Sequence, residues 1–321
     1  MSDKYTDNNN DRRRRVTVIT GSGKGIGKSI ALEFAKAGYC VMINDLEQEE
    51  LLKSTAEEIS KIIGDNTRVG YVIGDVSQEE ISVALVEQTI KKFQRIDVLI
   101  NNAAIAEKVA TKKPDQISTT ATNSHYKQAS RYFTLEEYEV ADANLKGAYF
   151  CIRQTVKRMA ELETKDENKK EKRFRRRKTY PYSIINISAP YESIPKVEAD
   201  EYTLSMSGVD PYTSSRAGVK TLTKTVAFQL SDKGIRVNAI APGLVATDII
   251  NEQFLEDEAK REEKVRGIPF HRIGQLEEIA KIALFLASDD ASYITGSMIY
   301  ADGGLSLSRS NYFLESKIEH D

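Results

Sequence analysis

Short apolar runs rich in β-branched residues alternate with amphipathic helical patterns along most of this chain of 321 residues. The runs cover residues 16–20, 39–44, 68–76, 96–101, 183–188, 235–240 and 297–301. Between them, for example at 47–63, 211–233 and 276–287, apolar residues recur every three or four positions, as on one face of a helix. Strands that are apolar throughout and separated by helices are typical of a parallel sheet covered on both faces. The pattern predicts one α/β domain, a Rossmann-like doubly wound parallel sheet of about seven strands with helices on both faces.

Two pairs of residues have the spacing of a capping box, which marks the start of a helix. Ser77 and Glu80 form the first pair, and Thr134 and Glu137 form the second. In such a box the hydroxyl and the carboxylate satisfy backbone N–H groups at the start of the helix. We therefore expect helices to begin just after Ser77 and Thr134, and the second helix to run to about residue 163.

Several polar segments do not fit the alternation of strands and helices. They are an N-terminal arm at 1–15, insertions near 106–133, 164–180 and 190–210, and a C-terminal tail at 305–321. The folded domain should therefore span residues 16–304. The 106–133 and 190–210 insertions follow strands four and five, so they leave the carboxyl ends of the strands, where ligands bind in open parallel sheets. The 164–180 link enters the fifth strand from its other end and should lie away from any such site.

The overall charge gives no reason to expect a polyanionic partner. The chain has 46 basic and 48 acidic residues, a net charge of −2, and so no global attraction to nucleic acid or to an anionic membrane. Residues 12–15 and 169–178 are locally basic, but only Phe174 interrupts the second run, which leaves no aromatic platform for bases. We interpret both runs as solvated surface, with contacts to nucleic-acid phosphates as the alternative.

Cysteine, histidine and apolar content limit the remaining classes. Cys40 and Cys151 stand in apolar contexts, which favours two buried free thiols over a disulfide. The three histidines are scattered without metal-ligand spacing, so we predict no metal site. No apolar run approaches the roughly 20 residues that span a bilayer, and no apolar stretch follows the basic N-terminal residues. We therefore expect a soluble cytoplasmic protein.

A glycine-rich turn joins the first strand to the first helix and is the strongest sign of a ligand. Glycines there allow a tight turn and let backbone N–H groups approach a pyrophosphate, which the helix N-terminus then stabilises. The alternative is a turn that needs glycine only for its backbone conformation. Its position between a strand and a helix favours a dinucleotide site built from Thr20, Gly21, Gly23, Lys24, Gly25, Ile26 and Gly27.

Asp45, at the end of the second strand, bears on which dinucleotide fits. A carboxylate there accepts hydrogen bonds from the adenosine ribose hydroxyls and repels a 2′-phosphate. Lys24 is the counter-signal, because its ammonium group could receive that phosphate. An ordinary residue at the start of a helix is the other interpretation of Asp45. The sequence thus favours NAD(H), and NADP(H) remains the alternative.

Further motifs follow the glycine loop in a fixed order. They are Asp75-Val76, Asn101-Asn102-Ala103-Ala104, Pro242-Gly243-Leu-Val245-Ala-Thr247, Tyr293-Ile-Thr-Gly296 and Asp302-Gly-Gly304. Together with the loop, they make residues 16–304 resemble the short-chain dehydrogenase/reductase family. The resemblance implies that Asp75 and Val76 lie against the adenine and that Asn102 and Ala103 adjoin the cofactor. It also implies that Pro242, Gly243, Val245 and Thr247 meet the nicotinamide carboxamide and the pyrophosphate.

The same resemblance assigns catalytic roles. Tyr212 matches the family's acid/base tyrosine, and Asn144 matches the asparagine that holds a water of the proton path. Arg216 stands where the family has a lysine that binds the nicotinamide ribose and lowers the tyrosine pKa. A guanidinium keeps the positive charge and so can still reach the ribose, but it does not release a proton near neutral pH.

The family's catalytic serine, which hydrogen-bonds the substrate carbonyl, maps to Ala189. Ser188 is one residue earlier, so an ideal strand would turn it to the other face of the sheet. Pro190 and the lengthened connection could shift the register, in which case Ser188 or Ser193 would serve instead. Loss of such a hydrogen bond costs about 2.7–4 kcal/mol of transition-state stabilisation.

The leading interpretation is an NAD(P)-dependent oxidoreductase that interconverts a secondary alcohol and a ketone with reduced activity. The alternative is a catalytically weak or inactive NAD(H)-binding protein that acts as a sensor or as an oligomer partner. The polar insertions fit a polar substrate such as a sugar. The resemblance implies a homodimer or homotetramer, and we expect no membrane partner.

Overall fold

The computed structural model of this protein describes residues 15–46, 49–104, 135–164, 181–190, 211–247, 262 and 265–307. Within these ranges, the side chains of residues 135–141, 162–164 and 211–213 are not described. The predicted 106–133 insertion, residues 1–14 of the arm, and nearly all of the 164–180, 190–210 and 305–321 segments lie outside the described residues. Thr134 and Ser193 lie outside them as well.

Seven parallel strands form one sheet, as the sequence predicts. In spatial order they are β3 (Val69–Ile73), β2 (Cys40–Asp45), β1 (Val16–Ile19), β4 (Val98–Asn101), β5 (Tyr182–Ile187), β6 (Ile235–Pro242) and β7 (Met298–Ala301). Every neighbouring pair is parallel. After β3 the chain crosses back over β2 and β1 to form β4, so the winding direction reverses between β1 and β4. In open α/β sheets, ligands bind beyond the carboxyl ends of the strands at such a switch point.

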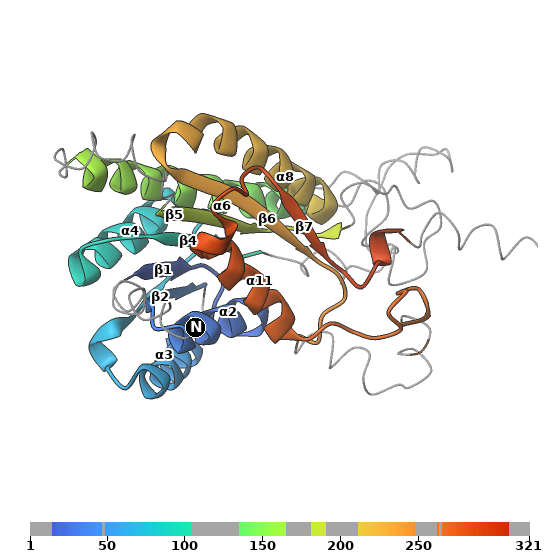
Figure 1. The fold of residues 1–321 in the computed structure, drawn as a ribbon, viewed down its shortest axis with the longest axis horizontal. Coiled ribbons are helices and arrows are strands. Elements are labelled where there is room, and N and C mark those ends of the chain that lie inside the picture. Colours follow the sequence, from blue (N-terminus) through green and yellow to red (C-terminus); the bar gives the residue numbers. More distant parts are fainter. Residues whose placement is uncertain are drawn as a thin grey trace, which may run out of the picture.

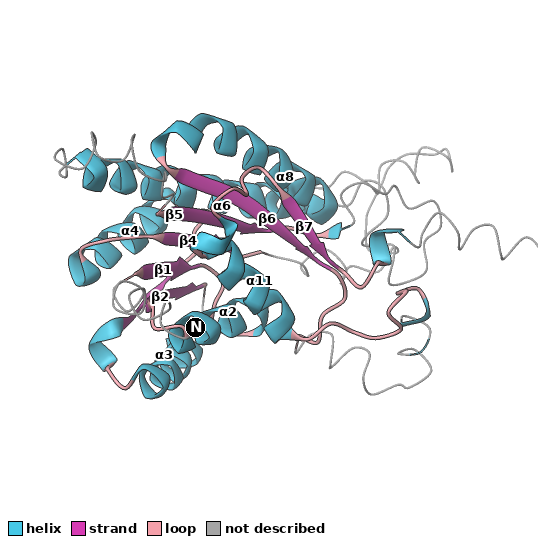
Figure 2. Cartoon of the chain, in the orientation of Figure 1, coloured by secondary structure: helices cyan, strands magenta, loops and turns pink. Residues whose placement is uncertain are grey.

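Helices cover both faces of this sheet (Figures 1 and 2). One face carries α2 (Gly25–Lys36), α3 (Glu49–Ile63) and α11 (Leu276–Ala287), and the other carries α4 (Glu79–Phe93), α6 (Leu135–Thr164) and α8 (Pro211–Leu230). A separate hydrophobic core fills each side, with Phe34 and Leu286 in the first and Leu85 and Cys151 in the second. The central strands are buried on both sides, which explains why their sequences are apolar throughout.

The third strand is shorter than the predicted 68–76. Residues Asn66–Arg68 form a 3-10 helix, η1, in which Asp65 Oδ1 accepts a hydrogen bond from the Thr67 N–H at 2.9 Å. At the other end, Gly74 has a φ of 138°, and a Cβ there would lie 2.7 Å from Ile81 Cδ1. The chain therefore leaves the sheet at a residue that must be glycine, and the β-branched Val76 belongs to the following turn.

The predicted capping box of Ser77 and Glu80 is wrong. Helix α4 begins at Glu79 with Gln78 as its N-cap, and the Ser77 N–H instead donates to Asp75 Oδ1 at 2.8 Å. An aspartate two residues earlier thus captures the serine's backbone in a local turn, so the serine is not the cap.

A capping-box contact does occur at α11, where sequence spacing had not suggested one. Glu278 accepts a hydrogen bond from the Gln275 N–H at 2.7 Å and two from the Arg272 guanidinium at 2.7 and 2.8 Å. The hydrogen bonds from Arg272, followed by the one from Gln275, lower the pKa of Glu278 to about 2.

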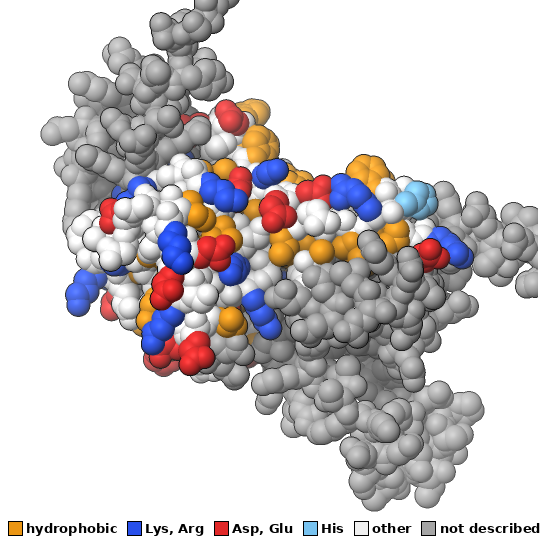
Figure 3. All heavy atoms as spheres, turned by 90° about the horizontal axis from the view of Figure 1, so that it is seen from below, with side chains coloured by type: hydrophobic (Ala, Val, Ile, Leu, Met, Phe, Trp, Pro, Cys, Tyr) orange, Lys and Arg blue, Asp and Glu red, His pale blue; other side chains and the backbone are white. Residues whose placement is uncertain are grey.

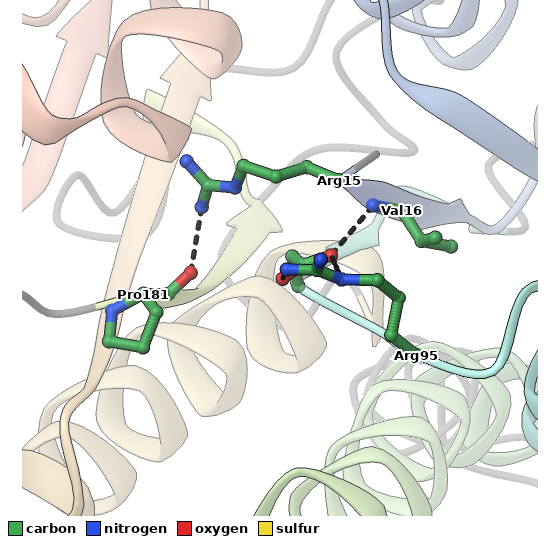
Figure 4. Close-up of polar contacts among 5 residues, drawn as sticks. Arg15, Val16, Arg95 and Pro181 are labelled. Atoms are coloured by element: carbon green, nitrogen blue, oxygen red, sulfur yellow. Dashed lines mark hydrogen bonds and ion pairs between the residues drawn. The ribbon is translucent and has the colours of Figure 1, made fainter. Parts of the chain in front are cut away.

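Figure 4 shows the amino end of the sheet, where the predicted arm boundary needs correction. Arg15 is only 9% exposed, and its guanidinium donates to the Pro181 carbonyl at 2.7 Å. Beside it, the buried Asp97 accepts the Val16 N–H at 2.7 Å and forms a two-bond ion pair with Arg95. Arg15 is therefore part of the folded domain and not of a solvated basic run. At the other end, Leu305 is also buried, so the domain continues past residue 304.

A second buried arginine holds the end of α11. Arg236, at the start of β6, is 1% exposed and donates to the carbonyls of Leu286 at 2.6 Å and Ser288 at 3.0 Å. Ser183, on β5, donates its hydroxyl to the same Leu286 carbonyl at 3.0 Å. Burial lowers the pKa of Arg236 to about 10, which leaves it protonated near neutral pH. A cation at a helix C-terminus satisfies carbonyls that the helix itself leaves unpaired.

The cysteines are free thiols, as predicted, but only one is buried. Cys151 is fully buried in α6, and burial raises the pKa of its thiol to about 12. Cys40, at the start of β2, is half-buried. Its neighbours on β2 point into the two cores, whereas the first residue of the strand lies at the rim of the sheet.

The visible surface is of mixed charge. Figure 3 views the face covered by α2, α3 and α11, where acidic and basic side chains are interspersed. Ion pairs such as Lys28–Glu58 at 2.9 Å and Lys53–Glu49 at 3.0 Å lie on these helices. Among the described residues, no helix is both long and apolar enough to cross a bilayer. Over the same part of the chain, no three His, Cys, Asp or Glu residues gather as metal ligands would.

Candidate cofactor and catalytic site

The glycine loop leaves β1 and enters α2 at the switch point of the sheet. Gly21 and Gly25 have φ values of 61° and 57°, in the left-handed region that favours glycine. A Cβ on Gly21 would lie 2.7 Å from the Ala103 Cα, and one on Gly27 would collide with the Gly21 carbonyl. The glycines are thus required both by backbone conformation and by the close approach of the loops after β1 and β4.

Hydrogen bonds lock these two loops together. Thr20 Oγ1 accepts the N–H groups of Asn102 and Ala103, both at 3.0 Å. In return, Asn102 Nδ2 donates to the carbonyls of Thr20 at 3.1 Å and Gly21 at 2.7 Å. Four of the predicted cofactor residues therefore meet in one rigid arrangement, which fixes where the N-terminus of α2 presents its N–H groups.

Asp45 lies at the edge of this loop. Its Oδ2 accepts the Gly23 N–H at 2.7 Å, and its Oδ1 accepts the Leu46 N–H at 2.8 Å. A Cβ on Gly23 would lie 2.8 Å from Asp45 Oδ2, so glycine is needed for this contact. Lys24 is the N-cap residue of α2 and is exposed. The Asp45 carboxylate therefore contacts the glycine loop at Gly23, and Lys24 is the next residue of that loop.

Two residues that support the loop were not predicted. The Ser22 hydroxyl donates to the Ile19 carbonyl at 2.9 Å and accepts the Asn44 N–H at 3.0 Å. Asn44 Nδ2 donates to the carbonyls of Val72 and Gly74, both at 3.0 Å. These bonds tie the carboxyl ends of β1, β2 and β3. The available signal was a buried polar residue at the end of each otherwise apolar strand.

The segment after β6 closes the other side of the site. The Gly243 N–H donates to the Ala301 carbonyl at 3.0 Å, and a Cβ on Gly243 would lie 2.6 Å from the Asp302 Cα. Beyond the end of β6 at Pro242, Val245 pairs with Gly274 in an isolated parallel bridge.

This segment reaches the glycine loop, because Thr247 Cγ2 lies 3.7 Å from a Cβ built on Gly25. The predicted cofactor residues from β1, β4 and β6 therefore converge on the N-terminus of α2.

The other predicted cofactor residues have mixed placements. Asp75 and Val76 follow β3 at the same edge, where Val76 is buried and Asp75 accepts the Ser77 N–H. Ile26, in the first turn of α2, is partly buried and packs against the core on that face of the sheet.

On the catalytic side, α6 and α8 approach closely. A Cβ on Gly218 would lie 3.0 Å from Leu145 Cδ2. This approach brings Asn144 to Ser215, and Asn144 Nδ2 donates to the Ser215 hydroxyl at 3.2 Å. Both residues are 3% exposed. The predicted asparagine is thus held next to the turn of α8 that carries Arg216.

Arg216 is buried and contacts the end of β5. It is 4% exposed, and its Nη1 donates to the Ile187 carbonyl at 2.7 Å. Ser188, 3% exposed, donates its hydroxyl to the Arg216 carbonyl at 3.1 Å. Ala189 is also buried, at 4%. Tyr212 lies in the first turn of α8, one helical turn before Arg216, and its side chain lies outside the described atoms.

Comparisons with known proteins agree with this geometry. A model of the short-chain dehydrogenases matches residues 15–166, and one described as enoyl-(acyl carrier protein) reductase matches residues 190–306. The 3beta-hydroxysteroid dehydrogenase 1 of Eggerthella lenta is 33% identical over 298 residues, which are 92% of this chain and 95% of that protein. The chain belongs to the short-chain dehydrogenase/reductase family. Another family member, glucose 1-dehydrogenase 2 of Bacillus subtilis, is 30% identical over 92% of this chain and 96% of its own length.

A solved structure of the family gives the same fold. The gluconate 5-dehydrogenase of Burkholderia cenocepacia, in complex with NADP and tartrate, superposes with a TM-score of 0.69 at 25% identity. The match covers 92% of this chain and 98% of that one. The names of these relatives describe dehydrogenases of a hydroxysteroid, of glucose and of gluconate, and the last of them has NADP bound.

Proposed function

We propose that this short-chain dehydrogenase/reductase interconverts a secondary alcohol and a ketone with NAD(H), and that it does so slowly. The observation that carries the proposal is the convergence of the glycine loop, Asp45 and Thr247 on the N-terminus of α2 at the switch point of the sheet. That is where an open α/β sheet binds a dinucleotide.

The residues present fit such a cofactor. Side chains at Gly21, Gly23 and Gly27 would collide with the surrounding loops, so the backbone there is bare. A Cβ on Gly25, in contrast, would meet only Thr247 among the described residues, at 3.7 Å, so this part of the structure leaves the backbone at the first residue of α2 open to a ligand. Backbone N–H groups at a helix N-terminus stabilise a pyrophosphate. When bound, the nicotinamide supplies or accepts the hydride.

Asp45 supports NAD(H) over NADP(H). Each of its carboxylate oxygens accepts one backbone N–H and has lone pairs left for ribose hydroxyls. Its charge disfavours a second anion at the ribose 2′ position. The structural relative from Burkholderia cenocepacia has NADP bound, so NADP(H) is the alternative cofactor.

Two substitutions support slow turnover. Tyr212 would give or take the proton of the substrate oxygen, and an ordinary tyrosine pKa near 10 needs a nearby cation for that work at neutral pH. Arg216 supplies the charge but does not relay a proton. Ala189 has no hydroxyl to bond the substrate carbonyl. A cofactor-binding protein with little or no turnover is the second candidate, and the same two residues favour it.

The polar composition of the 106–133 and 190–210 insertions favours a polar substrate such as a sugar, as in the Bacillus relative.

A homo-oligomer is supported by aromatic side chains at the surface. Phe228 on α8 is 86% exposed and Tyr149 on α6 is 50% exposed. Exposed apolar side chains mark a surface that another protein covers where they form one contiguous patch.

A glycine pair tests the cofactor site. Gly25 and Gly64 both have positive φ, at 57° and 72°, but Gly64 lies at the end of α3, where no atom of the described residues is within 4 Å of a built Cβ. Gly25→Ala and Gly64→Ala should therefore share a backbone cost of about 1–2 kcal/mol. Only Gly25→Ala should weaken NADH binding, measured by fluorescence titration. Equal affinities in the two variants, or no NADH binding by the wild type, would contradict the proposal.

Turnover is measured separately, as NADH oxidation with a panel of ketones and keto-sugars. Slow but measurable oxidation with one of them supports the enzyme. Tight NADH binding with no oxidation across the panel supports the second candidate.

A further inference from the structure

The end of β5 and helix α8 are joined by a reciprocal pair of hydrogen bonds, which we call the Ser188–Arg216 clamp. In one direction the Ser188 hydroxyl donates to the backbone carbonyl of Arg216 at 3.1 Å. In the other, Arg216 Nη1 donates to the carbonyl of Ile187 at 2.7 Å. The last residue of β5 and the residue after it thus hold both the side chain and the backbone of one helical residue.

The clamp is buried, which makes it stiff. Ser188, Arg216 and Ile187 are at most 4% exposed. The strand end is itself fixed, because the Ser188 N–H donates to the Ile240 carbonyl of β6 at 2.7 Å. Hydrogen bonds from a charged donor are stronger than neutral ones, and a planar guanidinium fixes the direction of its other N–H groups once one is bound. A flexible ammonium group would not transmit position in this way.

We propose that Ser188 is a positioning residue that acts through Arg216, and that it does not replace the hydroxyl missing at Ala189. A serine hydroxyl has a single proton to donate, and here that proton goes to the Arg216 carbonyl. By holding that carbonyl, Ser188 fixes where α8 presents the guanidinium to the cofactor ribose. The inference rests on the proposed function, in which Arg216 meets the ribose.

Ser183 provides a matched control on the same strand. It is also fully buried, and its hydroxyl donates to a helix carbonyl, that of Leu286, at 3.0 Å. It lies near the start of β5, whereas the clamp lies at the carboxyl end beside the candidate site. Ser183→Ala therefore removes the same kind of bond without touching Arg216.

The experiment compares Ser188→Ala and Ser183→Ala in the full chain. Both should lower the melting temperature by similar amounts. Only Ser188→Ala should raise the Kd for NADH. The expected increase is about three- to tenfold, because the net free energy of one hydrogen bond corresponds to at most about a tenfold change in Kd. Ser188→Thr keeps a hydroxyl and should restore most of the affinity. It also serves where the alanine variant fails to fold.

A double-mutant cycle with Arg216→Met, followed by thermal unfolding of the cofactor-free protein, tests the clamp without any ligand. Arg216→Met should cost less in the Ser188→Ala background than in the wild type, and its full cost should remain in the Ser183→Ala background.

Additive costs in the Ser188 cycle would overturn the clamp. An unchanged NADH Kd with a raised ketone KM in Ser188→Ala would instead assign Ser188 to the substrate and overturn the positioning role. Equal NADH effects from both serine variants would overturn it as well. Failure of the wild type to bind NADH would refute the proposed function, while the cycle would still decide the clamp.

Discussion

The charge of Asp45 can be removed while its contact with the glycine loop is kept, which makes cofactor preference a sharp test. Asp45 Oδ2 accepts the Gly23 N–H at 2.7 Å, so Asp45→Ala would both delete the charge and release the glycine loop. Asp45→Asn keeps the size of the side chain and one oxygen that can accept the Gly23 N–H, and it deletes the charge together with the acceptor for the exposed Leu46 N–H. We therefore expect Asp45→Asn to change the preference between the two cofactors and to leave NADH affinity nearly unchanged.

The size of the effect follows from the position of the carboxylate. Asp45 is half-buried at the end of β2, so the effective dielectric lies between those of water and of a protein surface. Two unit charges about 4 Å apart then repel by roughly 1–4 kcal/mol. A value near the middle, about 2 kcal/mol, corresponds to an NADPH Kd about thirtyfold above that of NADH. Most of that ratio should disappear in Asp45→Asn.

The measurement is a pair of fluorescence titrations, with NADH and NADPH, for the wild type and the variant. Asp75→Asn is the matched control. Asp75 is also a carboxylate that accepts a backbone N–H beyond a strand end at this edge, and the family resemblance places it against the adenine. It should therefore not alter the ratio. Equal wild-type affinities would show that Lys24 outweighs Asp45. A ratio that persists in Asp45→Asn would refute the electrostatic reasoning itself.

Three further outcomes are expected. Arg216→Lys combined with Ala189→Ser should raise kcat on an accepted ketone by more than about tenfold, which corresponds to 1.36 kcal/mol of activation free energy. If the wild type is already fast and the double variant is slower, the site works with arginine and the reasoning is refuted. A short Gly/Ser turn in place of residues 165–180 should leave NADH affinity intact, because the link joins α6 to the amino end of β5; a folded variant that no longer binds NADH would refute that placement. Hydrogen bonds, chiefly from Arg272, lower the pKa of Glu278 to about 2 from 4.5, so Glu278 contributes stability above pH 4.5 that is lost as the pH falls toward 2. Glu278→Gln should accordingly lower the free energy of unfolding above pH 4.5, by no more than about 1 kcal/mol because the pair is half-exposed, and should leave it unchanged near pH 2. A pH-independent difference would contradict this.

The sequence by itself determined the fold class and the order of the elements. Buried parallel strands must be apolar on both faces, and helices must present one apolar stripe. Each pattern is therefore contained in the short segment of sequence that forms the strand or the helix. The sequence also located the glycine loop, because a strand followed at once by closely spaced glycines and a helix has few other uses. Asp45 was placed by its position at the end of a strand, since the carboxyl ends of parallel strands meet at one edge, whereas Asn102 and Thr247 were placed by the resemblance to the family.

Local signals failed where two of them competed. The capping box predicted at Ser77 does not form, because the Asp75 carboxylate accepts the Ser77 N–H instead. The third strand ends before Gly74, although Val76 continues its β-branched pattern. Arg15 was grouped with a basic arm because a sequence shows charge and not burial. Only the fold supplied the Pro181 carbonyl that accepts its guanidinium.

Tertiary structure alone decided how the catalytic positions are connected. The pattern of residues predicts that Arg216 and Ala189 depart from the family, but it does not predict that Ser188 bonds the Arg216 carbonyl or that Asn144 bonds Ser215. These partners are 28 and 71 residues apart along the chain. A hydrogen bond depends on tenths of an ångström and on the direction of a single proton. Those are set by how β5, α6 and α8 pack together, and no local pattern in the sequence encodes them.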